Sequence, residues 1–309
     1  MEICESKHSD LPEIIALLKI SLGEKLIPKS EEFFLWKHEK NPFGKSKTLL
    51  AKEGDRIIGL RTFMYWKWKS ENDVIAGVRA VDTATDPAFQ GKGIFRKLTM
   101  TAVEKCTEEG VSLVFNTPNP VSMQGYLKMG WEVAGRLPLF IGRGSLLPRK
   151  WNKETDDDLK TFCPVDINEI NASTSEFFHT PLSREYINWR YRDCPLVNYG
   201  SMNDDDWGFI FRLKPFIGFM EMRICEAWSS KASEKYLQQA IRKCIARYKP
   251  ALVTCGSSPL LPNEIPLKRF FGPFKKGPVT TVRSLAMTGL SDFIEFKKWR
   301  PSIGSLELF

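Results

Sequence analysis

The feature that most constrains the fold of this 309-residue chain is the segment Val81–Leu98, where a strand runs through a glycine-bearing turn into a helix. Val74–Thr85 has the pattern of a strand, and we expect the helix from about Gly93 to Glu109. The backbone N–H groups of such a turn and of the first helical turn are unpaired donors, and the helix dipole favours negative charge. The segment therefore predicts an α/β architecture with a phosphate-binding site.

The turn itself, Gln90-Gly-Lys-Gly-Ile-Phe95, narrows the kind of site. It has neither the G-x-G-x-x-G pattern of dinucleotide-binding folds nor the G-x-x-x-x-G-K-[ST] pattern of P-loops. Glycines at 91 and 93 leave the backbone open to a phosphate, and Lys92, Arg96 and Lys97 add positive charge nearby. The net charge of +8 suits a phosphate-bearing ligand, whereas the wide spread of Lys and Arg argues against nucleic acid as the partner.

Two motifs resemble the GNAT superfamily of N-acetyltransferases. The first is the turn at Gln90, which is similar to the family's pyrophosphate loop, R/Q-x-x-G-x-G/A, and departs from the usual pattern at Phe95, where the family has Gly or Ala. The second begins with Asn119-Pro120, reaches Tyr126 seven residues after the Asn, and places Gly130 and Trp131 four and five residues further on. The resemblance covers about residues 1–145.

The resemblance implies how a donor, acetyl-CoA, would be bound. The strands Val78–Thr85 and Val111–Asn116 would splay apart to admit the pantetheine arm, and backbone N–H groups at Ala84 or Thr85 would face the thioester oxygen. Asn119 would lie beside the arm. The cofactor contacts that the resemblance implies are Ala84, Thr85, Gln90, Gly91, Lys92, Gly93, Ile94, Phe95 and Asn119.

The resemblance also implies the catalytic roles. Tyr126 would be the general acid that protonates the departing CoA thiolate, although a core or edge aromatic is the alternative interpretation. A primary amine would attack the thioester directly, and a base must take its proton. Asp82, on the cofactor strand, is the first candidate and Glu132 the weaker one, with an ordinary polar residue at the end of a strand as the alternative for Asp82.

The second half of the chain contains a diverged echo of the first. At an offset of 153 residues, five identities fall in one short window: Pro28, Ser30, Glu32, Trp36 and Pro42 match Pro181, Ser183, Glu185, Trp189 and Pro195. Chance similarity between two amphipathic helices is the alternative interpretation. The composition shifts between residues 146 and 158. We therefore predict an α/β fold of two tandem GNAT-like domains, each a twisted mixed sheet flanked by helices, with a catalytic domain over residues 1–147 and a degenerate copy over residues 148–309.

The second copy lacks the features of a CoA site. Its counterpart of the turn is Ser229-Ser-Lys-Ala232, without glycine, and no Asn-Pro segment follows its later strand. Phe270–Phe274 is interpreted as the echo of Tyr126–Trp131. We expect this copy to bind no CoA.

The remaining composition sets limits on function. The seven cysteines have no C-x-x-C spacing and the three histidines are dispersed, so we expect no metal. No apolar run approaches the ~20 residues of a membrane span, and the N-terminus does not look like a signal peptide, so we expect a cytoplasmic protein without a membrane partner. The sequence favours an acetyl-CoA-dependent N-acetyltransferase with a small-molecule amine acceptor. A non-catalytic CoA-binding or sensing module is the alternative, and the acceptor's identity and the oligomeric state stay open.

Overall fold

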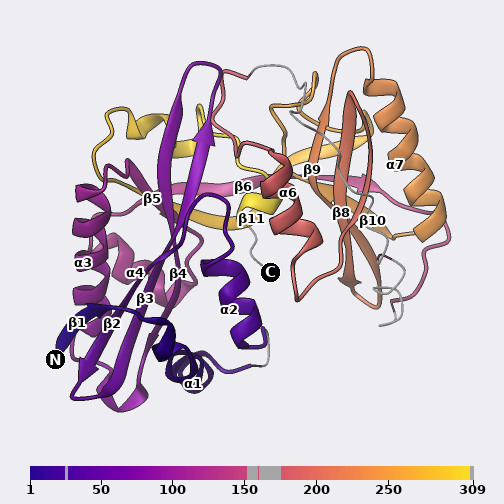
Figure 1. Cartoon of the computed structure of the whole chain (residues 1–309). Coiled ribbons are helices and arrows are strands. Elements are labelled where there is room, and N and C mark those ends of the chain that lie inside the picture. Colours follow the sequence, from indigo (N-terminus) through magenta and orange to yellow (C-terminus); the bar gives the residue numbers. More distant parts are fainter. Residues whose placement is uncertain (25–26, 152–158, 160–174, 307–309) are drawn as a thin grey trace. The chain divides into compact units, whose positions relative to one another are not determined.

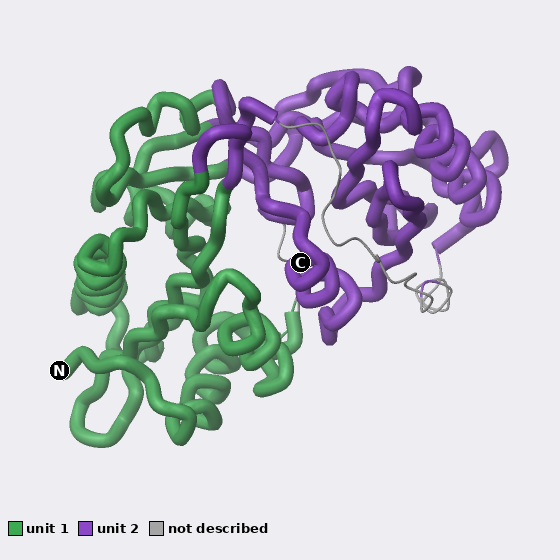
Figure 2. The backbone as a smooth tube through the Cα atoms, turned by 45° about the horizontal axis from the view of Figure 1, so that its top comes forward, with its two compact units in different colours: residues 1–68, 74–134, 280–295 green, residues 69–73, 135–279, 296–309 purple. Residues whose placement is uncertain are grey.

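The chain forms two compact units that do not follow one another simply along the sequence. The computed structural model describes residues 1–24, 27–151, 159 and 175–306. Unit 1 consists of residues 1–68, 74–134 and 280–295, and unit 2 holds the other described residues (Figure 2). The fold is mixed α/β in both units, as the sequence predicts.

Unit 1 combines strands with helices (Figure 1). Its elements are β1 (Glu2–Glu5), α1 (Leu11–Leu22), α2 (Glu31–His38), β2 (Lys47–Glu53), β3 (Arg56–Lys69), β4 (Val74–Thr85), α3 (Ile94–Glu108), β5 (Leu113–Asn116) and α4 (Pro120–Leu127). The strand order is β1-β2-β3-β4-β5, and the end of β11 (Phe270–Ser284) adds a further strand beside β5. β1, β2 and β3 pair antiparallel, whereas β4 and β5 are parallel.

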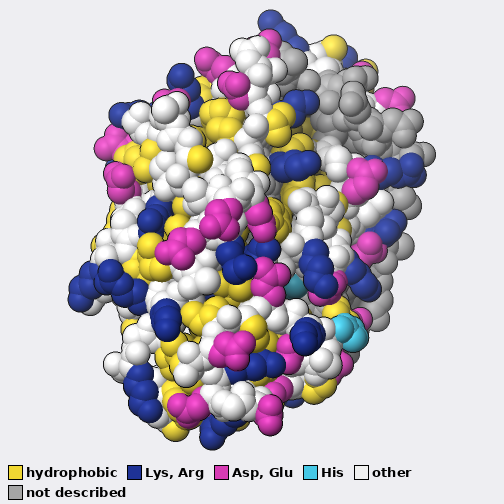
Figure 3. Space-filling model, turned by 60° about the vertical axis from the view of Figure 1, so that its left-hand side comes forward, with side chains coloured by type: hydrophobic (Ala, Val, Ile, Leu, Met, Phe, Trp, Pro, Cys, Tyr) yellow, Lys and Arg dark blue, Asp and Glu magenta, His cyan; other side chains and the backbone are white. Residues whose placement is uncertain are grey.

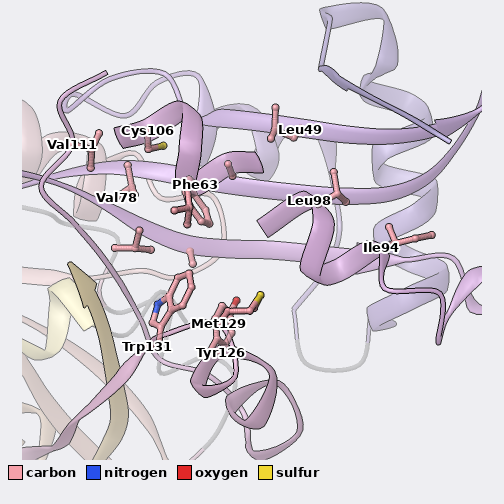
Figure 4. Packing of buried hydrophobic residues seen from close by; sticks show 14 of the residues in the cluster. Leu49, Phe63, Val78, Ile94, Leu98, Cys106, Val111, Tyr126, Met129 and Trp131 are labelled. Atoms are coloured by element: carbon pink, nitrogen blue, oxygen red, sulfur yellow. The ribbon is translucent and has the colours of Figure 1, made fainter. Parts of the chain in front are cut away.

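Apolar side chains spaced along α3 bury one face of that helix against the sheet of unit 1. Ile94, Leu98 and Cys106 of α3 are nearly or fully inaccessible to solvent and pack with the strand residues Phe63 and Val78 (Figure 4). Such i, i+4 spacing aligns side chains on one helix face, so burial of this face stabilises α3 in place. The packing fixes the N-terminus of α3 relative to the end of β4, where the predicted phosphate site lies.

Unit 2 repeats part of this order. Its elements are β6 (Glu132–Arg143, from Gly135 onward), α6 (Arg184–Ile187), the π-helical turn Asn188–Arg192, β7 (Gly200–Asp204), β8 (Trp207–Phe216), β9 (Phe219–Ser229), α7 (Glu234–Tyr248), β10 (Leu252–Cys255), most of β11 and α8 (Ile303–Leu306). The strand order is β6-β10-β9-β8-β7. β9 and β10 are parallel and joined through α7, as β4 and β5 are through α3.

The predicted internal repeat has a local structural counterpart. Ser30 accepts a hydrogen bond from the N–H of Phe33 at the start of α2, and Ser183, 153 positions later, accepts one from Tyr186 at the start of α6. Trp36 and Trp189, which the same offset relates, are both buried. The two segments therefore begin their helices in the same way, with a serine N-cap.

The structure bears on two of the sequence interpretations, an echo between two segments and the boundary after residue 147. Phe270–Phe274 lies at the start of strand β11, whereas Tyr126–Trp131 ends α4 and turns into β6, so the proposed echo between these segments is wrong. The compact units also differ from one cut after residue 147. The reason is that Thr281–Ser284 pair with β5 in unit 1, while β6 pairs with β10 in unit 2. A tandem boundary at 147 stays a prediction about the repeat.

Candidate active site

A cavity of about 420 Å³ opens in unit 1 where the end of β4 meets the N-termini of α3 and α4. Its walls come from the end of α1, from β4, from the β4–α3 loop and from α4. The lining residues are Ser21, Leu22, Thr83, Ala84, Thr85, Phe89, Gln90, Gly91, Gly93, Ile94, Phe95, Asn119, Val121, Ser122 and Gly125. All of the predicted cofactor contacts except Lys92 are among them. The Lys92 ammonium instead lies over the ring of Phe89, 4.6 Å from its centroid.

The loop before α3 has the backbone conformation that an anion site requires. Gly91 and Gly93 have φ of 77° and 74°, in the left-handed region that favours glycine. Gly93 is the N-cap of α3 and has no side chain to accept a hydrogen bond from the first helical turn. Since those N–H groups have no intrahelical partners, they are free to donate to an anion in the cavity.

Strands β4 and β5 part beside this loop. Their parallel pairing in the described residues runs only from Gly77–Arg79 on β4 to Leu113–Phe115 on β5, although β4 continues to Thr85. On its other side β5 pairs with β11, where Thr281 donates a hydrogen bond to the Asn116 side chain. The separation leaves the last residues of β4 facing the cavity.

Asn119 has a structural task that the sequence interpretation did not assign. It is the N-cap of α4, and its Oδ1 accepts a hydrogen bond of 2.8 Å from the backbone N–H of Ser122. Asn119 therefore fixes the start of α4 in addition to lining the cavity. An Asn-Pro pair before a helix carries this signal, because Pro is favoured at the first helical position.

Tyr126 lies one residue beyond the lining residue Gly125, in a cluster of aromatic rings. Its ring meets Phe95 edge-on with centroids 5.5 Å apart and meets Trp131 at 5.2 Å. Only 3% of the residue is exposed, and its packing beside Met129 and Trp131 is visible in Figure 4. Its hydroxyl has no hydrogen-bond partner among the residues that the structure describes, so it has a proton to offer to a ligand.

Asp82 does not line the cavity. Its carboxylate oxygen Oδ2 accepts from the Lys37 ammonium at 2.8 Å and from His38 Nε2 at 2.7 Å. Burial alone would raise the pKa of Asp82, but Lys37 and His38 hold it well below its usual range. A carboxylate in this state is a poor proton acceptor, so the geometry does not support the predicted role as base. That role stays a prediction. Glu132, the weaker candidate for the base, is exposed at the start of β6.

Sequence patterns gave no sign of two further parts of the site. Ser21 and Leu22, at the end of α1, form one wall, and the Ser21 hydroxyl donates to the Thr85 carbonyl at 3.1 Å. Lys37 and His38 reach Asp82 across 44 or more positions of sequence. Burial lowers the pKa of His38, whose Nδ1 bonds to Ser46 Oγ at 3.0 Å. No local motif predicts such contacts, because they arise only when α2 packs on β4.

The surface charge around unit 1 is mixed. On the face shown in Figure 3, Lys and Arg side chains are interspersed with Asp and Glu side chains. No helix within the described ranges of the chain is long and apolar enough to cross a membrane.

A strand, a glycine turn and a helix, with a cavity at the helix N-terminus and parting parallel strands, are the features expected of a GNAT-type acyltransferase domain. Comparison with known families agrees, because residues 2–134 match the model of the acetyltransferase (GNAT) domain. Residues 2–134 are thus a GNAT acetyltransferase domain, and the protein that carries this domain is an acyltransferase. No curated protein sequence matches the chain significantly.

Solved structures share the fold over most of the chain. A probable N-acyltransferase from Enterococcus faecalis has a TM-score of 0.64 and 11% identity, covering 92% of this chain and 73% of its own. A GCN5-related N-acetyltransferase from Anabaena variabilis has a TM-score of 0.61 and 10% identity, and the match covers 92% of this chain and 72% of that one. Eis1 from Mycobacterium abscessus has a TM-score of 0.57 and 11% identity, and the match covers 93% of this chain and 74% of that one. At these identities the likeness establishes the fold alone.

Proposed function

We propose that the protein is an acetyl-CoA-dependent N-acetyltransferase that acetylates a primary amine of a small molecule. The observation that carries the proposal is that Ala84 and Thr85 of β4, the loop residues Gln90, Gly91 and Gly93, and Asn119 all line one cavity. A pyrophosphate fits the N–H groups of the loop and of the first turn of α3. The parted β4 and β5 leave strand backbone with which a pantetheine arm can form hydrogen bonds.

Acetyl-CoA supplies an activated acyl group as a thioester. The chain's own contribution is to hold this group at the end of β4, where backbone N–H groups at Ala84 or Thr85 can stabilise negative charge that develops on the carbonyl oxygen. Tyr126, next to the lining residue Gly125, is the residue that we propose to protonate the sulfur as the C–S bond breaks. The neutral amine attacks directly, and its proton leaves through solvent or through a base that contacts the acceptor.

The site is proposed for unit 1 alone. The connection between β9 and α7 in unit 2, residues 230–233, contains no glycine, so it does not reproduce the loop before α3. A tandem protein with one donor site in residues 1–147 and a degenerate second copy is the organisation that we propose. Together with this use of acetyl-CoA we propose a cytoplasmic location.

The test is calorimetric titration of the whole protein with acetyl-CoA, with ATP and desulfo-CoA for comparison. Gly93→Glu should abolish binding, because the carboxylate would occupy the anion site. Gly110→Glu is the matched control: Gly110 also has a positive φ (78°) and open space around it, but it lies at the other end of α3. Equal binding by both variants would show that the loop is not the phosphate site.

Binding without turnover separates the alternative function. If the wild-type protein binds acetyl-CoA but releases no CoA thiol with a broad panel of amines, the non-catalytic CoA-binding module is the better description. The free hydroxyl of Tyr126 favours the enzyme, because a sensor has no need of a proton donor.

A further inference from the structure

Arg61, on β3, is a buried cation that the proposed chemistry has so far left unused. Its side chain is 0% exposed, and its three guanidinium nitrogens, Nε, Nη1 and Nη2, have no hydrogen-bond partner among the residues that the structure describes. An arginine is always protonated in a protein, so this is a buried positive charge. Burial of an unpaired charge is unfavourable, and an apolar residue of similar shape would stabilise the fold better.

The guanidinium lies within an arrangement of three aromatic rings. Its central carbon is 4.9 Å from the centroid of Phe63, 5.3 Å from that of Tyr126 and 5.7 Å from that of Phe95. Ring faces attract cations, which offsets part of the cost of burial. They supply no counter-charge, however, and Arg61 forms no ion pair with a carboxylate in the part of the chain that the structure describes.

One of these rings is the proposed proton donor. Tyr126 becomes negative when it gives up its phenolic proton, and a phenolate beside Arg61 completes the missing ion pair. Phe95 lines the cavity and also packs against Tyr126, so it separates the cation from the space that the donor would occupy. Exclusion of water by the rings strengthens the attraction between the two charges.

We infer that Arg61 is a positioning residue for acyl transfer, which stabilises the Tyr126 phenolate formed when the phenol protonates the leaving sulfur. The inference rests on the proposed function. In this step the amine nitrogen bonds to the acyl carbon, the C–S bond breaks with its electron pair on sulfur, and sulfur takes the phenolic proton to give CoA thiol. The nitrogen loses a proton to solvent, and the phenolate regains one from water before the next turnover.

Arg61→Met keeps the length of the side chain and removes the charge. We expect this variant to lose activity without losing stability. Thermal stability should be unchanged or higher, because an uncompensated buried charge is lost. The kcat should fall about tenfold or more with little change in the KM for acetyl-CoA. Arg61→Lys, which keeps a cation among the rings, should retain more of the kcat than Arg61→Met.

Arg190 of unit 2 provides a control, because its replacement by Met should change the melting temperature in the opposite direction. It is also buried, but its Nε donates to the Gly304 carbonyl at 3.2 Å and its Nη1 to the Tyr199 hydroxyl at 3.0 Å. Arg190→Met should therefore lower the melting temperature, since it leaves those acceptors without a donor.

The deciding experiment measures melting temperature and steady-state release of CoA thiol from acetyl-CoA for the wild type, Arg61→Met, Arg61→Lys, Tyr126→Phe and the double variant Arg61→Met/Tyr126→Phe. In the Tyr126→Phe background, Arg61→Met should cause no further loss of kcat, because no phenolate forms. Additive losses, an unchanged kcat in Arg61→Met, or a parallel fall of stability and kcat would overturn the role of Arg61. A wild type that releases no CoA with any amine would instead overturn the proposed function and the inference together.

Discussion

Gly125 and Phe95 pack against one another in the lining of the cavity: a Cβ at position 125 would lie 2.9 Å from Cε1 of the Phe95 ring. Phe95 is the residue at which the loop departs from the usual GNAT pattern. The absence of a side chain at 125, on α4, makes room for that larger side chain. The departure is therefore accommodated by packing between two elements, and the Phe95 ring reaches both Tyr126 and Arg61.

This contact predicts that the effect of Gly125→Ala on stability changes sign with the size of the side chain at position 95. Gly125→Ala should destabilise the wild-type protein by about 1–3 kcal/mol, because the new methyl group displaces the Phe95 ring. In a Phe95→Leu background the same substitution should be stabilising, because Ala is the better helix former. Urea denaturation of the four proteins in this cycle provides the measurement. A destabilisation of equal size in both backgrounds would mean that the two side chains do not compete for space.

Tyr126→Phe tests the proton donor. We expect kcat to fall by roughly 10²–10⁴ with nearly unchanged affinity for acetyl-CoA, as for the loss of a general acid. Stability should hardly change, because the hydroxyl bonds to none of the described residues and the ring stays in its aromatic cluster. Steady-state kinetics with calorimetric binding checks both parts, and an unchanged kcat would assign the ring to the core alone.

Asp82→Asn tests the buried ion pair and its dependence on pH. The pKa of Asp82 is lowered in the folded state, so its contribution to stability is complete above the unfolded pKa of about 3.9 and is lost as the pH falls below that value. The variant should lose about 3–5 kcal/mol at pH 7, because Lys37 is left unpaired. Free energies of unfolding at pH 7 and pH 3 should differ less for the variant than for the wild type. A matching pH dependence in the two proteins would contradict the assigned ion pair.

The sequence predicted those parts of the fold and site that depend on neighbouring residues. The glycine turn at 91 and 93 and the apolar periodicity after it act within a few positions of the chain, and they predicted the helix from about Gly93 to Glu109, which is α3 (Ile94–Glu108) in the structure. The cofactor loop was recognisable for the same reason.

The parts that sequence reasoning missed depend on distant contacts. The pairing of Thr281 with Asn116 joins residues 165 positions apart, and it determines which unit the end of β11 belongs to. The burial of Arg61 among rings from three elements and the bonding of Asp82 to α2 have no local signature. The sequence left two interpretations of Asp82 open, a base and an ordinary polar residue, because it cannot show that Lys37 and His38 contact the carboxylate.

Glu226, on β9 of unit 2, gives a stability prediction that runs opposite to that of Asp82. Burial raises the pKa of Glu226 to about 7, although the hydroxyls of Tyr191 and Ser302 donate to its Oε1 at 2.6 and 2.7 Å. The folded state therefore keeps the proton that the unfolded chain loses near pH 4.3, so stability falls as the pH rises from about 4 to about 7. The loss is on the order of 3 kcal/mol, at 1.36 kcal/mol for each pKa unit. Glu226→Gln stays neutral and can still accept from both hydroxyls, so it should be more stable than the wild type at pH 8 and closest to it near pH 4. Chemical denaturation between pH 4 and pH 8 measures how the free energy of unfolding depends on pH. If Glu226→Gln keeps the full pH dependence of the wild type, another group is responsible for it.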